Sequence, residues 1–250
     1  MQRFRVWLCV VSLALLTVIA RPALAQAPPP PPHKVWDEAA SLGVSTTSGN
    51  SDASQFNAAF DLVYDPLTKN IVKSNALFLR GSTEGALAAE RFLWNFRDER
   101  KINARTYVFG QNLYLRDKFK RISYLDALTV GLGYKIVDTP ETKFDVDGGL
   151  GGVWEKNIGA SLEKSGAITA GERLQQKLSA TATLTQSVTG LWKTSDTSDA
   201  LYTFGVGVAV AVSGRTQLKF EVLDVFKNKP PTATVKKNDI ATVVAIVFKS

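Results

Sequence analysis

Cysteine and histidine are almost absent from this chain of 250 residues, and each occurs once, near the N-terminus. Cys9 is the only cysteine, so the chain beyond it has no thiol for a disulfide, a nucleophile or a lipid anchor. His33 is the only histidine, which argues against a serine–histidine pair or a histidine–metal site in the rest of the chain. The sequence therefore predicts no cofactor, no metal site and no catalytic residue.

Long hydrophobic runs are also missing beyond residue 25. Arg3 and Arg5 precede an apolar run over residues 6–20, and Ala23-Leu24-Ala25 supplies a small-x-small cleavage pattern. The run is shorter than the roughly 20 residues that span hydrocarbon as a helix. Residues 1–25 are therefore predicted to be a signal peptide for export, and the interpretation as a membrane anchor is rejected.

Residues 26–35 are predicted to form a periplasmic tail, since Pro28 to Pro32 favour an extended conformation. From residue 36 to residue 250 the composition does not shift, which predicts one domain. The formal net charge is +7, but the basic residues are spread along the chain and form no stripe, so no nucleic-acid partner is expected.

What the chain does have is strict alternation of large apolar and small residues. From Tyr202 to Val212 it reads YTFGVGVAVAV, which places the large side chains on one face of an extended strand. The same period of two recurs between turn residues along the rest of the domain. The predicted strands are 36–47, 54–65, 69–81, 89–101, 103–116, 122–136, 142–156, 162–177, 180–194, 199–212, 215–228 and 236–249.

These strands predict an all-β fold, an antiparallel up-and-down transmembrane β-barrel of about twelve strands, with ten as the alternative. Most strands have 12 to 16 residues, more than the five or six that are usual in globular proteins. The connections expected at the end of the barrel where the domain begins are short, and those at the opposite end are generally longer, as in outer-membrane barrels. Aromatic residues near strand ends are interpreted as girdles at the membrane interfaces, namely Tyr64, Tyr124, Tyr134, Phe144, Trp154, Trp192, Tyr202, Phe226 and Phe248.

Charged residues alternate with the apolar ones in mid-strand, and they favour a wet lumen over the dry interior of a soluble barrel. The candidate lumen residues are Arg97, Asp145, Asp147, Lys219 and Glu221. The lipid-facing residues of one strand are predicted to be Phe204, Val206, Val208 and Val210. The orientation of strand 103–116 stays open, because both of its faces are mixed.

Asp145 and Asp147 lie on one side of their strand and could begin a cation site. Oxygen-ligand sites need more donors than two carboxylates, so pairing with Arg97 or Lys219 is the favoured interpretation. Gly49 and Asn50 are interpreted as turn residues rather than as a phosphate loop. The glycines of 148–152 precede no helix, so they are taken to permit strand curvature or close packing and not to form a dinucleotide site.

Several short motifs together resemble the family of salt-induced outer-membrane proteins, a group of unknown function. They are Gly49-Asn50-Ser51-Asp52 after Trp36, Tyr114-Leu115-Arg116-Asp117-Lys118-Phe119, Gly131-Leu132-Gly133-Tyr134, Leu184-Thr185-Gln186-Ser187, and the stretch from Lys237-Asn238-Asp239 to Phe248. The resemblance implies an outer-membrane β-barrel with no established ligand, and a role in salt or envelope stress.

The leading interpretation is thus a barrel in the outer membrane of a Gram-negative bacterium that contacts outer-membrane lipid and the barrel assembly machinery. A narrow channel for ions or small solutes is the first alternative. A membrane-embedded enzyme that uses lumen carboxylates and a soluble periplasmic barrel are the others.

Overall fold

The long alternating segments fold as twelve β-strands in the computed structural model, which describes residues 34–48, 53–83 and 86–249. The predicted signal peptide, residues 26–33 of the predicted tail, and the Gly49-Asn50-Ser51-Asp52 turn lie outside the described residues. The strands are β1 Trp36–Ser48, β2 Ala53–Tyr64, β3 Asn70–Thr83, β4 Ala86–Lys101, β5 Thr106–Asp117, β6 Ile122–Asp138, β7 Thr142–Asn157, β8 Leu162–Lys177, β9 Ala182–Lys193, β10 Ala200–Ala211, β11 Thr216–Lys227 and β12 Asn238–Lys249.

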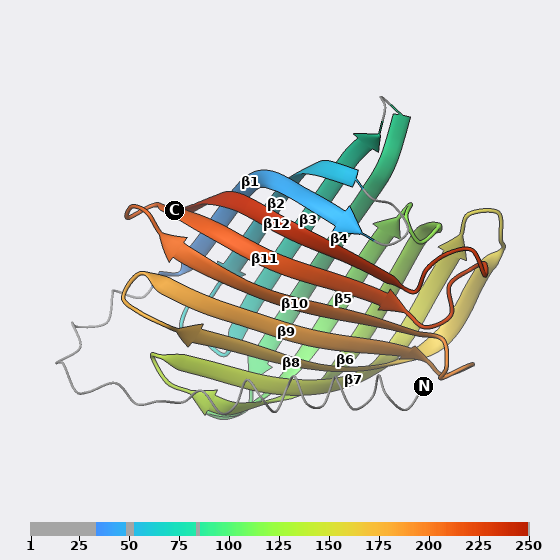
Figure 1. The fold of residues 1–250 in the computed structure, drawn as a ribbon. Coiled ribbons are helices and arrows are strands. Elements are labelled where there is room, and N and C mark those ends of the chain that lie inside the picture. The colour runs from blue at the N-terminus through green and yellow to red at the C-terminus, as the bar shows by residue number, and fades with distance from the viewer. Residues whose placement is uncertain (1–33, 49–52, 84–85, 250) are drawn as a thin grey trace. The chain divides into compact units, whose positions relative to one another are not determined.

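Each strand pairs antiparallel with the next, and β1 pairs with β12, so the sheet closes into a barrel (Figure 1). The closing seam is continuous from Ala39 opposite Lys249 to Ser48 opposite Ile240. The prediction of an antiparallel barrel with twelve strands is confirmed, and the alternative of ten strands is wrong. We call the end where β1 begins and β12 ends the near end, and the opposite end the far end.

The strands are long enough to cross a membrane. They contain 12 to 17 residues, and the shortest extends about 40 Å at roughly 3.3 Å per residue. A tilt of about 40° reduces that length to about 30 Å along the barrel axis, which matches the thickness of the hydrocarbon core.

The connections are less asymmetric than the sequence suggested. The region 81–88 was expected to be an outer loop, yet β3 runs to Thr83 and β4 starts at Ala86. The far-end turn between β5 and β6 is tight, since the Asp117 carboxylate accepts hydrogen bonds from the backbone amides of Phe119 and Lys120. The connection from residue 228 to residue 237 is long, as expected.

Burial identifies the face of each strand that looks into the lumen. Leu79, Ile122 and Leu125 are fully buried, which in a single closed sheet is possible only inside it. The side chains that alternate with the inward ones point outward, and many of them are exposed, as in Val130 at 65% and Leu150 at 64%. An apolar outer face of this extent is typical of a surface that contacts a membrane or another protein.

This assignment gives the orientation of β5, the predicted strand 103–116 whose orientation stayed open. Tyr107, Phe109 and Leu115 of β5 are buried inside, and Asn112 and Tyr114 point outward.

The aromatic residues named above all lie on the outward face, some toward each end of the barrel. At the far end Trp192, Tyr202 and Phe226 lie on adjacent strands, with ring centroids 5.6 and 5.9 Å apart. The Trp192 indole also donates a hydrogen bond of 2.9 Å to the Tyr202 hydroxyl. At the near end, the centroids of Trp36 and Tyr64 are 4.3 Å apart.

Candidate functional site

The lumen is filled in its far half by apolar side chains. We call this set the apolar layer: Leu79, Leu115, Ile122, Leu125, Ala127, Val153, Ala167, Leu191, Leu201, Leu223, Val225 and Ala241. Its members lie in the far half of their strands and come from both walls of the barrel. No member is more than 8% exposed, so the layer closes the lumen to water at this level.

Two buried ionic groups lie beside the apolar layer, toward the far end. In the first, which we call the Arg91 group, the Arg91 guanidinium contacts Asp117 at 2.7 Å and Asp239 at 3.7 Å. Lys120 completes the group from the turn between β5 and β6. Its ammonium lies 2.9 Å from Asp239 and donates a hydrogen bond of 2.7 Å to the backbone carbonyl of Lys237.

Burial lowers the pKa of the Lys120 ammonium below its ordinary range, and the Asp239 carboxylate opposes that shift. The charge on Lys120 therefore depends on its partner from β12. The contact between Lys120 and Asp239 therefore holds this turn to β12, the last strand of the barrel.

The second ionic group, the Glu155 group, joins four strand ends. Glu155 accepts contacts from Lys193 at 2.9 Å and Lys227 at 2.8 Å. Asp199 pairs with the same two lysines at 2.6 and 2.8 Å. Glu163 adds a third contact to Lys193, at 2.8 Å, from an exposed position. The two groups link β4 to β12 and β7 to β11 across the mouth of the barrel.

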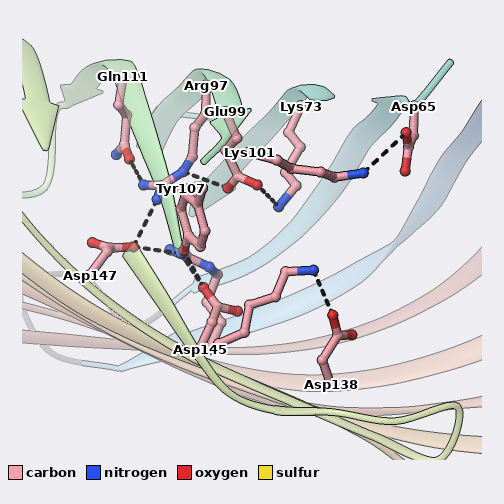
Figure 2. Close-up of polar contacts among 12 residues, drawn as sticks. Asp65, Lys73, Arg97, Glu99, Lys101, Tyr107, Gln111, Asp138, Asp145 and Asp147 are labelled. Carbon is pink, nitrogen blue, oxygen red and sulfur yellow. Dashed lines mark hydrogen bonds and ion pairs between the residues drawn. The ribbon is translucent and has the colours of Figure 1, made fainter. Parts of the chain in front are cut away.

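The near half of the lumen contains a polar network on the wall of β3 to β8, shown in Figure 2. We call it the Arg97 network: Lys73, Arg97, Glu99, Tyr107, Gln111, Asp145, Asp147 and Arg173. Arg97 is buried at its centre and donates to Glu99 at 2.8 Å, Gln111 at 2.6 Å and Asp147 at 3.0 Å. Its guanidinium also lies 3.7 Å from the centroid of the Phe109 ring, a cation–π contact.

Arg173 of β8 connects the two aspartates of β7. It lies 2.6 Å from Asp145 and 2.5 Å from Asp147, and its contact to the Tyr107 hydroxyl is 3.1 Å. That hydroxyl also donates to Asp145 at 2.7 Å. Both carboxylates are thus bound by arginine, and the pairing of Asp147 with Arg97 agrees with the favoured interpretation.

The five candidate lumen residues all lie on the inward face, but the structure brings only three of them together. Arg97, Asp145 and Asp147 belong to the Arg97 network. Lys219 and Glu221 lie on β11 and pair with each other at 2.9 Å, half-buried. Lys219 was a possible partner for the aspartates, and it does not fill that role.

The sequence interpretation missed Arg173 and both far-end ionic groups. Arg173 alternates in step with the other inward residues of β8, so its position along the strand could have identified it as a lumen residue. The Glu155 group could not have been found this way. Its partners are far apart in sequence, since Glu155 and Lys227 are separated by 72 positions.

Glycines on the inner wall make room for the aromatic residues of the network. A Cβ built on Gly133 would lie 2.0 Å from the Tyr107 ring, and one on Gly131 would lie 2.7 Å from the Phe109 ring. Gly149 lies next to the same Phe109 ring. Of the glycines in residues 148–152, Gly149 therefore allows close packing.

The outward face contains the predicted lipid-facing residues of β10. Phe204, Val206, Val208 and Val210 lie on the opposite face to Gly207 and Ala209, which pair with the inward Glu221 and Lys219. Asp126 also points outward, where its carboxylate accepts a hydrogen bond of 2.6 Å from the Asn112 amide.

Within the described part of the chain, no three His, Cys, Asp or Glu side chains come together as metal ligands. The described residues also contain no helix that is both long and apolar enough to cross a membrane.

Comparison with solved structures shows the same fold in outer-membrane proteins. The NanC porin aligns with a TM-score of 0.58 and 8% identity, covering 84% of this chain and all of that one. An outer-membrane channel from Pseudomonas putida F1 aligns with a TM-score of 0.55 and 11% identity, covering 87% and 97%. At these identities the likeness concerns the fold alone. Comparison with curated protein sequences gives no match. The model of the family described as "Protein of unknown function, DUF481" matches residues 40–249, and the chain belongs to that family.

Proposed function

We propose that this protein is a barrel of the Gram-negative outer membrane whose lumen is closed at rest, and that it acts as a narrow, gated channel for small solutes when the far end opens. The observation that carries the proposal is the filled far half of the lumen, above a polar near half. The apolar outer face and the likeness to outer-membrane barrels support the location.

The closed state follows from the energetics of the apolar layer. An ion that crossed it would lose its hydration, and the charged groups beside the layer are already paired with one another, so the crossing would cost several kcal/mol. The two ionic groups hold the surrounding strand ends and the Lys120 turn in place. Opening therefore requires both the apolar contacts and some of these ion pairs to separate.

The solutes that suit this lumen are small and polar. In the near half, Lys219 and Glu221 are half-buried, and Thr185 is exposed on the lumen side. Charges of both signs line the near half, so the lining has no strong preference for cations or anions. An enzymatic role has less support, because Asp145 and Asp147 are both paired with arginine and so poorly placed to act as bases.

Planar-bilayer conductance tests the closed lumen and the barrier together. The purified wild-type protein is expected to leave the bilayer sealed. A triple variant with Leu125→Ala, Leu201→Ala and Leu223→Ala is expected to conduct, because it thins the apolar layer from both walls.

The matched control replaces three outward residues of the same strands, with Leu128→Ala, Val208→Ala and Phe220→Ala. This control is expected to stay sealed, and heat-modifiable migration on a gel shows that each variant has folded. Steady conductance by the wild type would contradict the closed lumen. A triple variant that folds but does not conduct would contradict the apolar layer as the barrier.

The proposal extends to salt or envelope stress, supported by the resemblance of the motifs, and to insertion by the barrel assembly machinery. Growth of a deletion strain at raised salt tests the first. Loss of the protein from the membrane fraction after depletion of the machinery tests the second.

A further inference from the structure

The outward face of the barrel has a pair of lysines near the far end of β7 and β8. Lys156 lies opposite Tyr124 on β6 and opposite Leu162 on β8, and Lys164 lies opposite Trp154. The two lysines are therefore diagonal neighbours, roughly 7–8 Å apart at their backbones. Both are exposed, and neither is in an ion pair with a described residue.

Two other basic residues near this rim share one carboxylate, whereas the two lysines have none among the described residues. Arg116 and Lys118 both contact Glu90, at 3.5 and 3.2 Å. The nearby Asp126 lies one outward position deeper, opposite Trp154, and is hydrogen-bonded to Asn112. The lysine pair thus presents two free positive charges at the level of the outward Tyr124 and Trp154.

Below the lysines, a groove of about 820 Å³ runs over the outward face of β4 to β8. Its outward lining is mostly apolar, with Asp98 and Arg100 at the β4 edge and Val108, Gly110, Val130, Leu132, Gly148, Leu150 and Ile168 over the rest. The groove exists because glycine takes positions where other strands carry large side chains. A Cβ built on Gly110 would meet nothing within 4 Å, and one on Gly148 would meet only the Thr169 carbonyl at 3.7 Å.

The lysines and the groove are spaced as the two parts of one lipid. Ile168 is four residues from Lys164 on β8, and Gly148 is eight residues from Lys156 on β7. These separations are about 13 and 26 Å along the strands, or about 10 and 20 Å along the barrel axis at a tilt of about 40°. One leaflet of the hydrocarbon core is about 15 Å thick. A phosphate between the two lysines would therefore place the end of an attached acyl chain in the groove.

We propose that this face binds a phosphorylated lipid of the outer leaflet, with its phosphate between Lys156 and Lys164 and an acyl chain along the Gly110–Gly148 groove. Charge complementarity selects the phosphate, and Tyr124 and Trp154 suit the interface at which it lies. The inference rests on the proposed membrane location, with the far end in the outer leaflet.

Native mass spectrometry of the folded protein in detergent tests the site, with lipid A carrying two phosphates as the probe and dephosphorylated lipid A as its comparison. The wild type is expected to retain the phosphorylated probe and to bind the other weakly. Each lysine near an anionic headgroup contributes about fivefold in binding. Lys156→Ala with Lys164→Ala is therefore expected to weaken binding about thirtyfold.

Two further variants separate specific binding from general attraction. Lys69→Ala with Lys177→Ala removes two exposed charges at the near end and is expected to leave binding unchanged. Gly110→Phe with Gly148→Phe fills the groove without removing any charge and is expected to weaken binding.

Equal binding of the two probes, or an equal loss in the near-end variant, would overturn the phosphate site. Full binding by the groove variant would overturn the acyl-chain groove. Cell fractionation tests the membrane location separately from the lipid site. A protein found in outer membranes that fails these tests refutes the lipid site alone, and a protein found soluble in the periplasm refutes the location as well.

Discussion

Glu155→Gln is expected to destabilise the barrel by about 3 kcal/mol or more, because Glu155 balances two buried lysines. Its carboxylate lies 2.9 Å from Lys193 and 2.8 Å from Lys227, and all three side chains are at most 4% exposed. At an effective dielectric constant of about 20, each contact is worth roughly 6 kcal/mol before desolvation. Removing one member of such a buried group costs about 3–5 kcal/mol, since the remaining charges stay buried. Glutamine keeps a hydrogen-bond acceptor, which places the expected loss near the lower limit.

Glu163→Gln is the matched control, because it makes the same chemical change at a partner of the same lysine. Glu163 lies 2.8 Å from Lys193, but its side chain is 61% exposed. Exposed pairs contribute about 0–1 kcal/mol. Equilibrium unfolding in urea from lipid vesicles, followed by tryptophan fluorescence, gives both free energies of unfolding. A difference between the two variants below 1 kcal/mol would refute the reasoning that burial determines the strength of this group.

Two further predictions concern the wall and the far-end loops. Gly131→Ala is expected to cost about 1–3 kcal/mol by overpacking against the Gly148 backbone carbonyl and the Phe109 ring. Gly110→Ala, whose new Cβ would meet nothing within 4 Å, is expected to change the free energy of unfolding by less than that in the same urea assay. Hydrogen bonding from Lys229 lowers the pKa of Asp196 to about 2, so this pair should persist as the pH falls below 3.8 and be lost near pH 2. An NMR titration of the Asp196 carboxyl tests this, and a pKa that stays low in Lys229→Ala would contradict it.

The strands and the barrel could be predicted from the sequence because their signal is local. Phe204, Val206 and Val208 are each followed by a glycine or an alanine, and this period of two can be recognised without knowing the partner strand. The strand number followed from counting such segments between turns. The inward position of Arg97 and Asp147 followed from the same parity.

The ionic contacts at the far end could not be predicted, because they depend on the geometry of the closed barrel. Glu155 and Lys227 are 72 positions apart and lie on strands that do not pair with each other. The outward Asp126 violates the apolar pattern of β6, and its explanation is a hydrogen bond to Asn112 on the adjacent strand. Alternation gives the face of a side chain, but the register decides which side chain lies beside it.

The same geometry determines where a solute could enter the lumen. The wall from β4 to β7 contributes large inward side chains, including Arg97, Tyr107 and Phe109, which pack against inward glycines of β6 and β7. β9 and β10 contribute small ones, such as Thr185 and Ala209, next to Lys219 and Glu221 of β11.

Followed toward the far end, this side of the lumen reaches Leu191, Leu201 and Leu223, and then the two lysines of the Glu155 group. Strand number alone does not make a barrel of this size a pore. Here the open or closed state is decided where the small inward residues of β9 and β10, and Lys219 and Glu221 of β11, give way to leucines. Substitutions along these three strands are therefore expected to change conductance more than those along β4 to β7.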